Sequence, residues 1–286
     1  MNPFVCLSTS EPELLSPTVL ADMGLDSPQA LHENARHIAD AAAKICQTRG
    51  GTLARLPFCN TLEAEALGAP VRLSAQGAFV PHQPYASVQE TPESLSINSP
   101  RIDAMLKAVS ILRGQSLCVA YGATGIFTVL SQLVPMGPLF KSLRGAEGRA
   151  LLERVEKACL DYAERAYRAG AQILSYADPV ATVDIVGCRT FCASVAPSLA
   201  RFLDGVRQRC PDMVVFLCGK MSQSLLDADA ARFEAAPVPT GLNLEQALLW
   251  VVGQPGDKGT LGLGCLNHLD GGCRALNRLY FDESEG

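Results

Sequence analysis

The chain has 286 residues, of which 48% are hydrophobic and 19% charged, and its formal net charge is −5. This composition supports a substantial buried core, which excludes global disorder. The acidic balance does not indicate a nucleic-acid-binding protein, and no apolar run approaches the roughly 20 residues of a membrane-spanning helix. Because the N-terminal segment carries Glu11 and Glu13 and lacks the basic region of a secretory signal, we expect a cytoplasmic protein with reduced cysteines.

Helical and strand patterns follow one another along the chain. Apolar residues spaced three and four apart indicate helices, and short apolar runs indicate strands. Ser27 is a candidate N-cap for the first helix, and Gly170 is a candidate C-cap for the longest one. The predicted elements are helices at 28–47, 62–67, 102–112, 126–134, 149–169, 196–209 and 243–252, strands at 52–56, 116–120, 171–176, 213–218 and 260–265, and mostly loop at 76–100.

This order predicts an α/β fold. Helices separate most of the strands, so the sheet should be parallel with right-handed crossovers. The length is near the roughly 250 residues of a (β/α)8 TIM barrel, and no linker divides the chain. We therefore expect a single barrel domain over 1–286, with a helical segment at 1–50 and a frayed acidic tail at 282–286. Only five strands are predicted, so a shortened or incomplete barrel stays open.

Two cysteines end predicted strands, and a barrel carries its chemistry at the C-terminal ends of its strands. Cys218 ends the strand at 213–218 and Cys265 ends the strand at 260–265, with His268 three residues further on. Zinc takes sulfur and nitrogen ligands, and it would remove the proton from a bound substrate thiol. The alternative is that both cysteines are ordinary core residues.

Two carboxylates are candidates for catalysis. Asp178 follows the strand at 171–176, where it is either a turn or N-cap residue or a group that orients substrate. Glu63 and Glu65 lie two apart on a short helix, so at most one faces inward, and solvated surface is the alternative for both.

Other polar residues receive local interpretations. The stretch 122–125 is interpreted as a loop before a helix, which can cradle an anion. His32 and His37 are expected at the surface, and His82 lies in a stretch that we interpret as a lid.

Four motifs give the chain a family resemblance. The segment 57–69, PFCNTLEAEALGA, is similar to the T-[IV]-E-A-E-A-L-G segment of the methylcobamide:coenzyme M methyltransferases. Three weaker similarities follow in order: GIFT at 125–128 to G-P-F-T, DPVA at 178–181 to D-P-x-A, and LCG at 217–219 to the end of H-x-C-G. From about residue 50 to about residue 265, the chain resembles this corrinoid-linked branch of the uroporphyrinogen decarboxylase superfamily.

The resemblance implies an enzyme that moves a methyl group between a methylcorrinoid, free or on a carrier protein, and a thiol or other small-molecule acceptor. In relatives, a zinc ion held by a histidine, a cysteine and a distant cysteine activates the acceptor thiol. Cys218 matches the cysteine of the family motif, Phe216 stands where its histidine is expected, and Cys265 and His268 are the remaining candidate ligands.

The other expected site residues are the catalytic pair Asp178 and Glu63, and Asn60, Tyr121 and Gly122 as binding residues for the corrinoid co-substrate. Family barrels often pair, so a homodimer is a further expectation.

Two other functions stay open. A metal-free decarboxylase of a tetrapyrrole or a smaller acid needs basic groups, and Arg55 and Arg72 are the arginines near the pocket. Uroporphyrinogen itself is disfavoured as the substrate. It carries eight carboxylates, and the resemblance implies arginines near the N-terminus for its binding, whereas this chain has only Arg36 and Arg49 before residue 51. Phe216 at the expected histidine position motivates the third possibility, a barrel that binds a corrinoid without chemistry.

Overall fold

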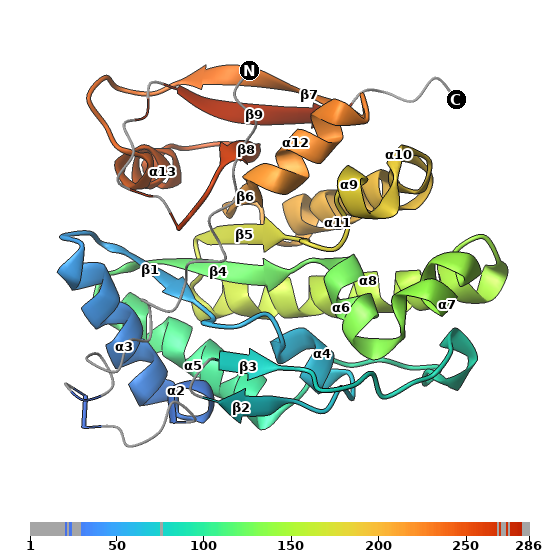
Figure 1. Ribbon diagram of the computed structural model, residues 1–286. Coiled ribbons are helices and arrows are strands. Elements are labelled where there is room, and N and C mark those ends of the chain that lie inside the picture. The colour runs from blue at the N-terminus through green and yellow to red at the C-terminus, as the bar shows by residue number, and fades with distance from the viewer. Residues whose placement is uncertain are drawn as a thin grey trace.

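A seven-stranded sheet runs through the centre of the computed structural model, which describes residues 21, 23–24, 30–74, 77–267, 269, 273 and 275–281 (Figure 1). The strand order is β1-β4-β5-β6-β8-β9-β7. The first five of these strands are parallel, and β9 runs antiparallel to both of its neighbours. Their bounds are β1 Leu53–Leu56, β4 Cys118–Thr124, β5 Ile173–Ala177, β6 Val214–Cys218, β8 Thr260–Gly264, β9 Ala275–Phe281 and β7 Ala231–Pro237.

All five predicted strands are confirmed, and four strands were missed. β2 (Arg72–Ser74) and β3 (Gly77–Phe79) form a separate antiparallel hairpin at the start of the polar stretch. β7 and β9 lie at the end of the large sheet, where both are largely exposed or half-buried. Their sequences mix polar and apolar residues, so neither has the continuous apolar run of a strand that is buried on both faces.

Helices flank the sheet. Those that match predictions are α3 Ala35–Thr48, α4 Leu62–Ala66, α5 Pro100–Gly114, α6 Ile126–Leu133, α8 Ala146–Ala169, α11 Ala196–Arg209 and α13 Leu244–Gly253. Shorter helical elements that were not predicted are α7 Met136–Ser142, α9 Val183–Val186, α10 Cys188–Thr190, α12 Gly219–Asp227, the 3-10 turn Val88–Glu90 and the π-helical turn Phe191–Val195. Gly170 ends α8 in the left-handed conformation, as predicted.

The first predicted helix is divided in two. Asn34 separates α2 (Ala30–Glu33) from α3, because its side-chain oxygen accepts hydrogen bonds from the N–H groups of Arg36 and His37. This is the N-cap arrangement of a new helix. The candidate N-cap Ser27 lies outside the described residues, as do His268 and the acidic tail at 282–286.

The two faces of the sheet pack against different layers. On one face, strand residues such as Leu56, Tyr121 and Leu217 join a large apolar cluster with α3, α5, α8 and α11. On the other face, Phe216 and its neighbours pack against α13 and the segment that follows β8. Side chains alternate between faces along a strand, so the second set lines the concave side of a barrel-like cup.

Side-chain hydrogen bonds, and not a pair of strands, link β1 to the other side of the cup. β1 and β7 are the two edges of the described sheet, so hydrogen bonds between described strands do not close a barrel. Instead, Glu245 at the start of α13 accepts the backbone N–H groups of Thr52 (2.6 Å) and Leu53 (3.0 Å) beside β1. Arg55 of β1 donates to the carbonyl of Leu266 at 2.7 Å. The expectation of a shortened or incomplete barrel is confirmed, and the described helices include none that is long and apolar enough to cross a membrane.

Candidate functional site

The two candidate metal-binding cysteines lie on adjacent strands at the C-terminal edge of the sheet. Cys218 is the last residue of β6, and its partner across the strand pair is Gly264, the residue before Cys265. The register shifts between Phe216 and Cys218, so that Gly264 lies opposite Cys218 and Cys265 follows it directly at the end of β8. Both thiols are half-buried. The structure therefore brings these two predicted residues to neighbouring strand ends.

A complete metal-ligand set is not present among the described residues. Within that part of the chain, no group of three or more His, Cys, Asp or Glu side chains is placed to hold a metal ion. The third predicted ligand, His268, lies outside it. The Sγ of Cys265 accepts the backbone N–H of Asn267 at 3.4 Å. Thiols are suitable zinc ligands in kind, but a catalytic zinc site needs three protein ligands, so the metal assignment stays a prediction.

Phe216 fills the concave face where the resemblance expects a histidine. Its side chain is 1% exposed, and a Cβ added to Gly264 would lie 2.7 Å from its ring. The ring occupies that volume, so glycine at position 264 is required by close approach. No imidazole donor is available at this position of β6.

Glu63 is buried beneath the end of β4. Its side chain is 1% exposed, so the solvated-surface interpretation is wrong for this residue. One carboxylate oxygen accepts the backbone N–H of Thr124 (2.9 Å) and the hydroxyl of Tyr121 (3.1 Å), and the other accepts the Thr124 hydroxyl (2.7 Å). Burial raises the pKa of Glu63, and the hydrogen bonds from Thr124 act in the opposite direction. Glu65 instead pairs with Arg101 at 2.7 Å.

Asp178 holds the start of α6. Oδ2 accepts the N–H of Phe127 (2.9 Å) and the hydroxyl of Tyr176 (3.2 Å), while Oδ1 accepts the N–H (2.9 Å) and hydroxyl (2.7 Å) of Thr128. Its side chain is only 2% exposed, and burial raises the pKa of Asp178. The carboxylate acts as an N-cap supplied by another strand, next to the positive end of the helix dipole.

Asp178 and Glu63 both stabilise the connection between β4 and α6. Glu63 binds the last residue of β4, and Asp178 binds the first turn of α6. A Cβ at Gly125 would lie 2.1 Å from the Cβ of Asp178, so the turn requires glycine there. A direct contact between either carboxylate and the substrate remains a prediction.

Tyr121 and Gly122 lie within β4 and not in the loop that the sequence suggested. The strand continues to Thr124, so the interpretation of 122–125 as an anion-cradling loop is wrong. The Tyr121 ring packs edge-on against Tyr162, with centroids 5.0 Å apart, in the cluster on the helix-covered face. Gly122 occupies the next position of the strand and therefore faces the concave side.

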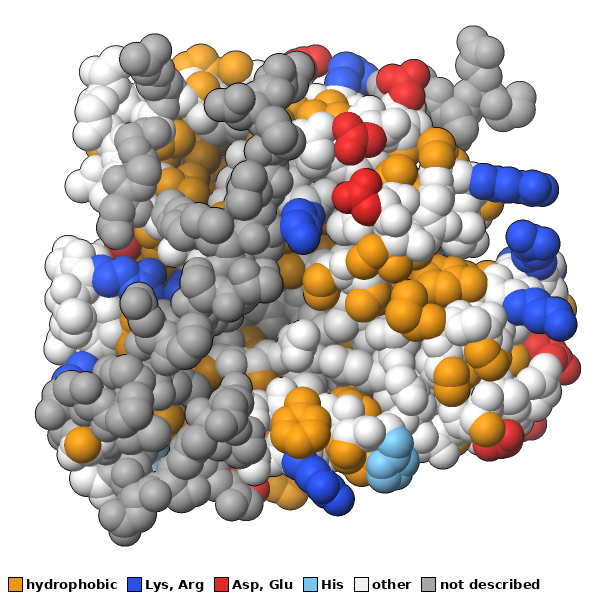
Figure 2. Space-filling model, in the orientation of Figure 1, with side chains coloured by type: hydrophobic (Ala, Val, Ile, Leu, Met, Phe, Trp, Pro, Cys, Tyr) orange, Lys and Arg blue, Asp and Glu red, His pale blue; other side chains and the backbone are white. Residues whose placement is uncertain are grey.

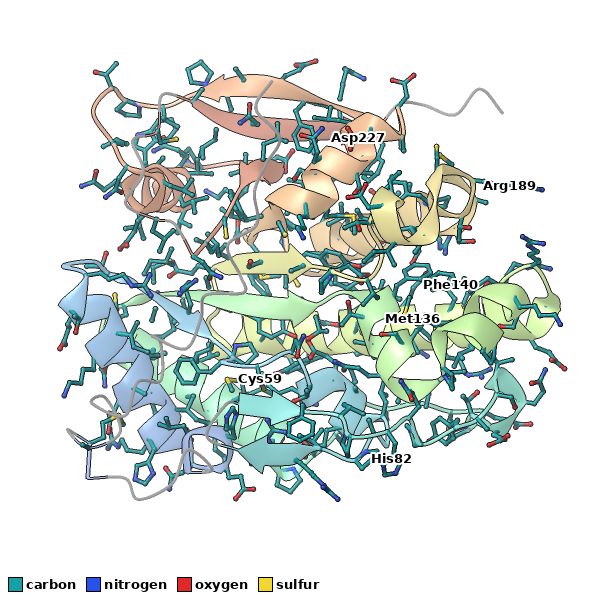
Figure 3. The ribbon with its side chains drawn as sticks, viewed as in Figure 1. Cys59, His82, Met136, Phe140, Arg189 and Asp227 are labelled. Atoms are coloured by element: carbon teal, nitrogen blue, oxygen red, sulfur yellow. The ribbon has the colours of Figure 1, made fainter. Side chains whose placement is uncertain are left out.

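Asn60 lines a cleft of about 300 Å³ beside the β2–β3 hairpin. The cleft is lined by Asn60, Thr61, Ala78, Phe79, Val80, Gln83, Ser131, Gln132 and Met136. The Gln132 side chain donates to the carbonyl of Asn60 at 3.1 Å. Figure 2 shows hydrophobic side chains gathered on this face of the molecule, and Figure 3 places Met136 and Phe140 on α7, toward the ends of β4 and β5. His82 is exposed and lies away from these two residues in the same view.

A buried polar cluster was missed from the sequence. Arg101 is 5% exposed and donates to Glu65, to the Sγ of Cys59 (3.3 Å) and to the carbonyl of His32 (3.3 Å). His32 is 2% exposed, so its predicted surface position is wrong. Burial, with Arg101 as the second cause, lowers the pKa of His32 to about 4. Arg101 could have been found from its spacing, because it lies one helical turn before Met105 and therefore on the same buried face of the helix.

The fold and the strand-end residues define an α/β protein with an open, TIM-barrel-like sheet and two thiols at its C-terminal edge. The chain belongs to the uroporphyrinogen decarboxylase family, whose model, described as Uroporphyrinogen decarboxylase (URO-D), matches residues 18–256. The predicted resemblance is thereby confirmed.

Similar proteins come from the methyltransferase branch of this family. The chain is 27% identical over 239 residues to the methylcobamide:CoM methyltransferase MtaA of Methanosarcina barkeri, a match that covers 79% of this chain and 66% of that protein. It is 25% identical over 230 residues to the methylcobamide:CoM methyltransferase MtbA of Methanosarcina mazei, covering 77% and 67%.

The structural comparison supports the same fold. A methyltransferase from Methanosarcina mazei superposes with a TM-score of 0.63 at 22% identity, over 74% of this chain and 64% of that one. The chain thus spans about two thirds of the length of the relatives that it matches.

Proposed function

We propose that the chain is a corrinoid-related methyltransferase, which moves a methyl group between a methylcorrinoid and a thiol acceptor. The observation that carries this proposal is the similarity to a methylcobamide:CoM methyltransferase over 79% of the chain. The family match at 18–256 includes the C-terminal ends of β1, β4, β5 and β6. In a barrel-like fold, those strand ends are the expected place for the chemistry.

The reaction is a nucleophilic transfer. The acceptor thiol loses its proton to solvent, and its sulfur attacks the methyl carbon of the substrate. A carbon–sulfur bond forms while the cobalt–carbon bond breaks, and the electron pair of that bond stays on cobalt. We propose that Cys218 and Cys265, together with His268, hold the activating group at the strand ends. Zinc bound there would lower the pKa of the acceptor thiol.

The buried carboxylates have a positioning role in this proposal. Asp178 and Glu63 fix the two ends of the β4–α6 turn through Thr128 and Thr124. Tyr121 supports Glu63 from within the core. Asn60 in the cleft and Gly122 on the concave face are the positions that we assign to corrinoid binding. A carrier protein as methyl donor and a homodimer remain predictions.

Methyl transfer from methylcobalamin to 2-mercaptoethanesulfonate tests the proposal. The reaction is followed anaerobically by the change in the visible spectrum of the corrinoid and by the loss of free thiol. We expect turnover by the wild-type chain and a loss of more than about 10-fold in Cys218→Ser, because even residues that only orient a metal ligand cost about 10–100-fold when they are replaced. The matched control is Cys210→Ser, because Cys210 lies between α11 and β6, at the end of β6 that is opposite to Cys218.

The other functions predict different results. Corrinoid binding without turnover would identify a binding protein, and release of carbon dioxide from a porphyrinogen without methyl transfer would identify a decarboxylase. Full activity in Cys218→Ser would contradict the assigned role of this thiol.

A further inference from the structure

Two cysteines outside the candidate site lie in contact at the surface. The Sγ atoms of Cys188 and Cys192 are 3.8 Å apart. Both side chains are exposed, whereas the other described cysteines are buried or half-buried. The pair lies between β5 and α11, in the long connection that follows Asp178. In Figure 1 this connection, with α9 and α10, is seen beside α12.

The backbone around the pair is irregular. Gly187, between α9 and α10, has φ 76° and ψ 150°, a region that is essentially restricted to glycine. A Cβ at Gly187 would meet no atom within 4 Å, so the backbone alone requires glycine. Cys192 lies in the π-helical turn Phe191–Val195, and such turns occur frequently at functional sites. The segment that carries both thiols is therefore not a regular α-helix with fixed spacing.

The same segment is attached to α12 by two hydrogen bonds. The thiol of Cys192 donates to the carbonyl of Ala228 at 3.7 Å, and the N–H of Val183 donates to the hydroxyl of Ser224 at 3.2 Å. Because α12 begins directly after Cys218, these bonds link the connection after β5 to the connection after β6. A thiol that loses its hydrogen can no longer make the first of these bonds.

We propose that Cys188 and Cys192 form a reversible intramolecular disulfide by exchange with a small-molecule disulfide. The thiolate of Cys188 attacks one sulfur of the small disulfide, forms a mixed disulfide and releases one small thiol. The thiolate of Cys192 then attacks the sulfur of Cys188 and releases the second small thiol. In total, two protein thiols lose two protons and two electrons, and the small disulfide gains them.

The order of attack follows from the surroundings of the two thiols. Partial desolvation by neighbouring atoms and the hydrogen bond with Cys188 raise the pKa of Cys192, although its side chain is exposed, and this lowers its thiolate fraction. Cys188 is exposed and lies next to Arg189, whose side chain extends away from α10 into solvent (Figure 3). Cys192 also donates to the carbonyl of Ala228, and this hydrogen bond favours its protonated form. We therefore assign Cys188 as the first attacker and Cys192 as the resolving thiol.

The modification is tested with oxidised glutathione under non-denaturing conditions, followed by mass spectrometry and peptide mapping. We expect the wild-type chain to lose two hydrogens and to give a peptide cross-linked between Cys188 and Cys192. The matched variants Cys188→Ser and Cys192→Ser should stop at a mixed disulfide with one glutathione on the remaining thiol. Reduced glutathione in excess should restore both wild-type thiols.

Other outcomes overturn the proposal. Wild-type protein that carries glutathione on Cys188 or Cys192 without an internal cross-link would show that the two sulfurs do not exchange. A cross-link from either of these cysteines to a different cysteine would also contradict the proposed pairing. Because the assay measures covalent state and not methyl transfer, its failure is independent of the proposed function.

Discussion

The two buried carboxylates should respond very differently to amide substitution. In Asp178, each oxygen accepts one backbone N–H, from Phe127 or from Thr128. The asparagine of Asp178→Asn offers one oxygen, so its NH₂ group must face the remaining backbone donor. In Glu63, a single backbone N–H is bound, and the second oxygen faces the Thr124 hydroxyl, which can accept a hydrogen bond instead.

The expected magnitudes follow from these partners. A buried donor left unsatisfied costs about 1–3 kcal/mol, and lost hydrogen bonds to a charged group add to this cost, so we expect Asp178→Asn to lower the free energy of unfolding by about 3 kcal/mol. Glu63→Gln keeps all three contacts and removes the cost of burying a charge, so we expect a change below about 1 kcal/mol.

Urea denaturation measures the difference. With a slope of about 3 kcal/mol per molar urea, Asp178→Asn should lower the midpoint by about 1 M, whereas the midpoint of Glu63→Gln should move little. Equal losses in the two variants, or an undisturbed Asp178→Asn, would refute the hydrogen-bond assignment.

Three further predictions concern folding. Because the pKa of His32 is lowered to about 4, the unfolded chain binds more protons than the folded chain between pH 4 and pH 6.5. About 3 kcal/mol of stability should therefore be lost as the pH falls through this window. Urea midpoints at several pH values check this, and His32→Gln should not show the loss. Gly125→Ala should lower the melting temperature through the clash with Asp178, whereas Gly137→Ala, in open helical space, should raise it slightly. Glu245→Ala should speed amide exchange at the start of β1, and Glu245→Gln should not.

The strands of the parallel sheet were predictable because each is short, rich in apolar residues and largely buried. Val214–Cys218 is the clearest example. β9 was not predictable in this way, because only Leu276 and Leu279 are buried and its other residues are half-buried. Closure by Glu245 and Arg55 was also hidden, since each partner lies about 200 residues away in sequence.

The candidate site, too, was predictable from the sequence only in part. The position of Cys218 and Cys265 at strand ends followed from local patterns, but their relative level depends on a register shift that no local pattern encodes. Asp178 was found as a polar residue at a strand end, and Glu63 as one of two glutamates on a short helix. Their partners at 124–128 lie 50 to 61 residues away, so their role as caps of the β4–α6 turn required the tertiary structure.

Methyl-transfer rates of Cys218→Ser, Cys265→Ser and the double variant test most directly whether the two thiols form one site. If they act as a unit, each single substitution should lower kcat about as far as the double substitution does. Losses that multiply in the double variant would contradict a shared site, and so would a double variant that turns over at the wild-type rate.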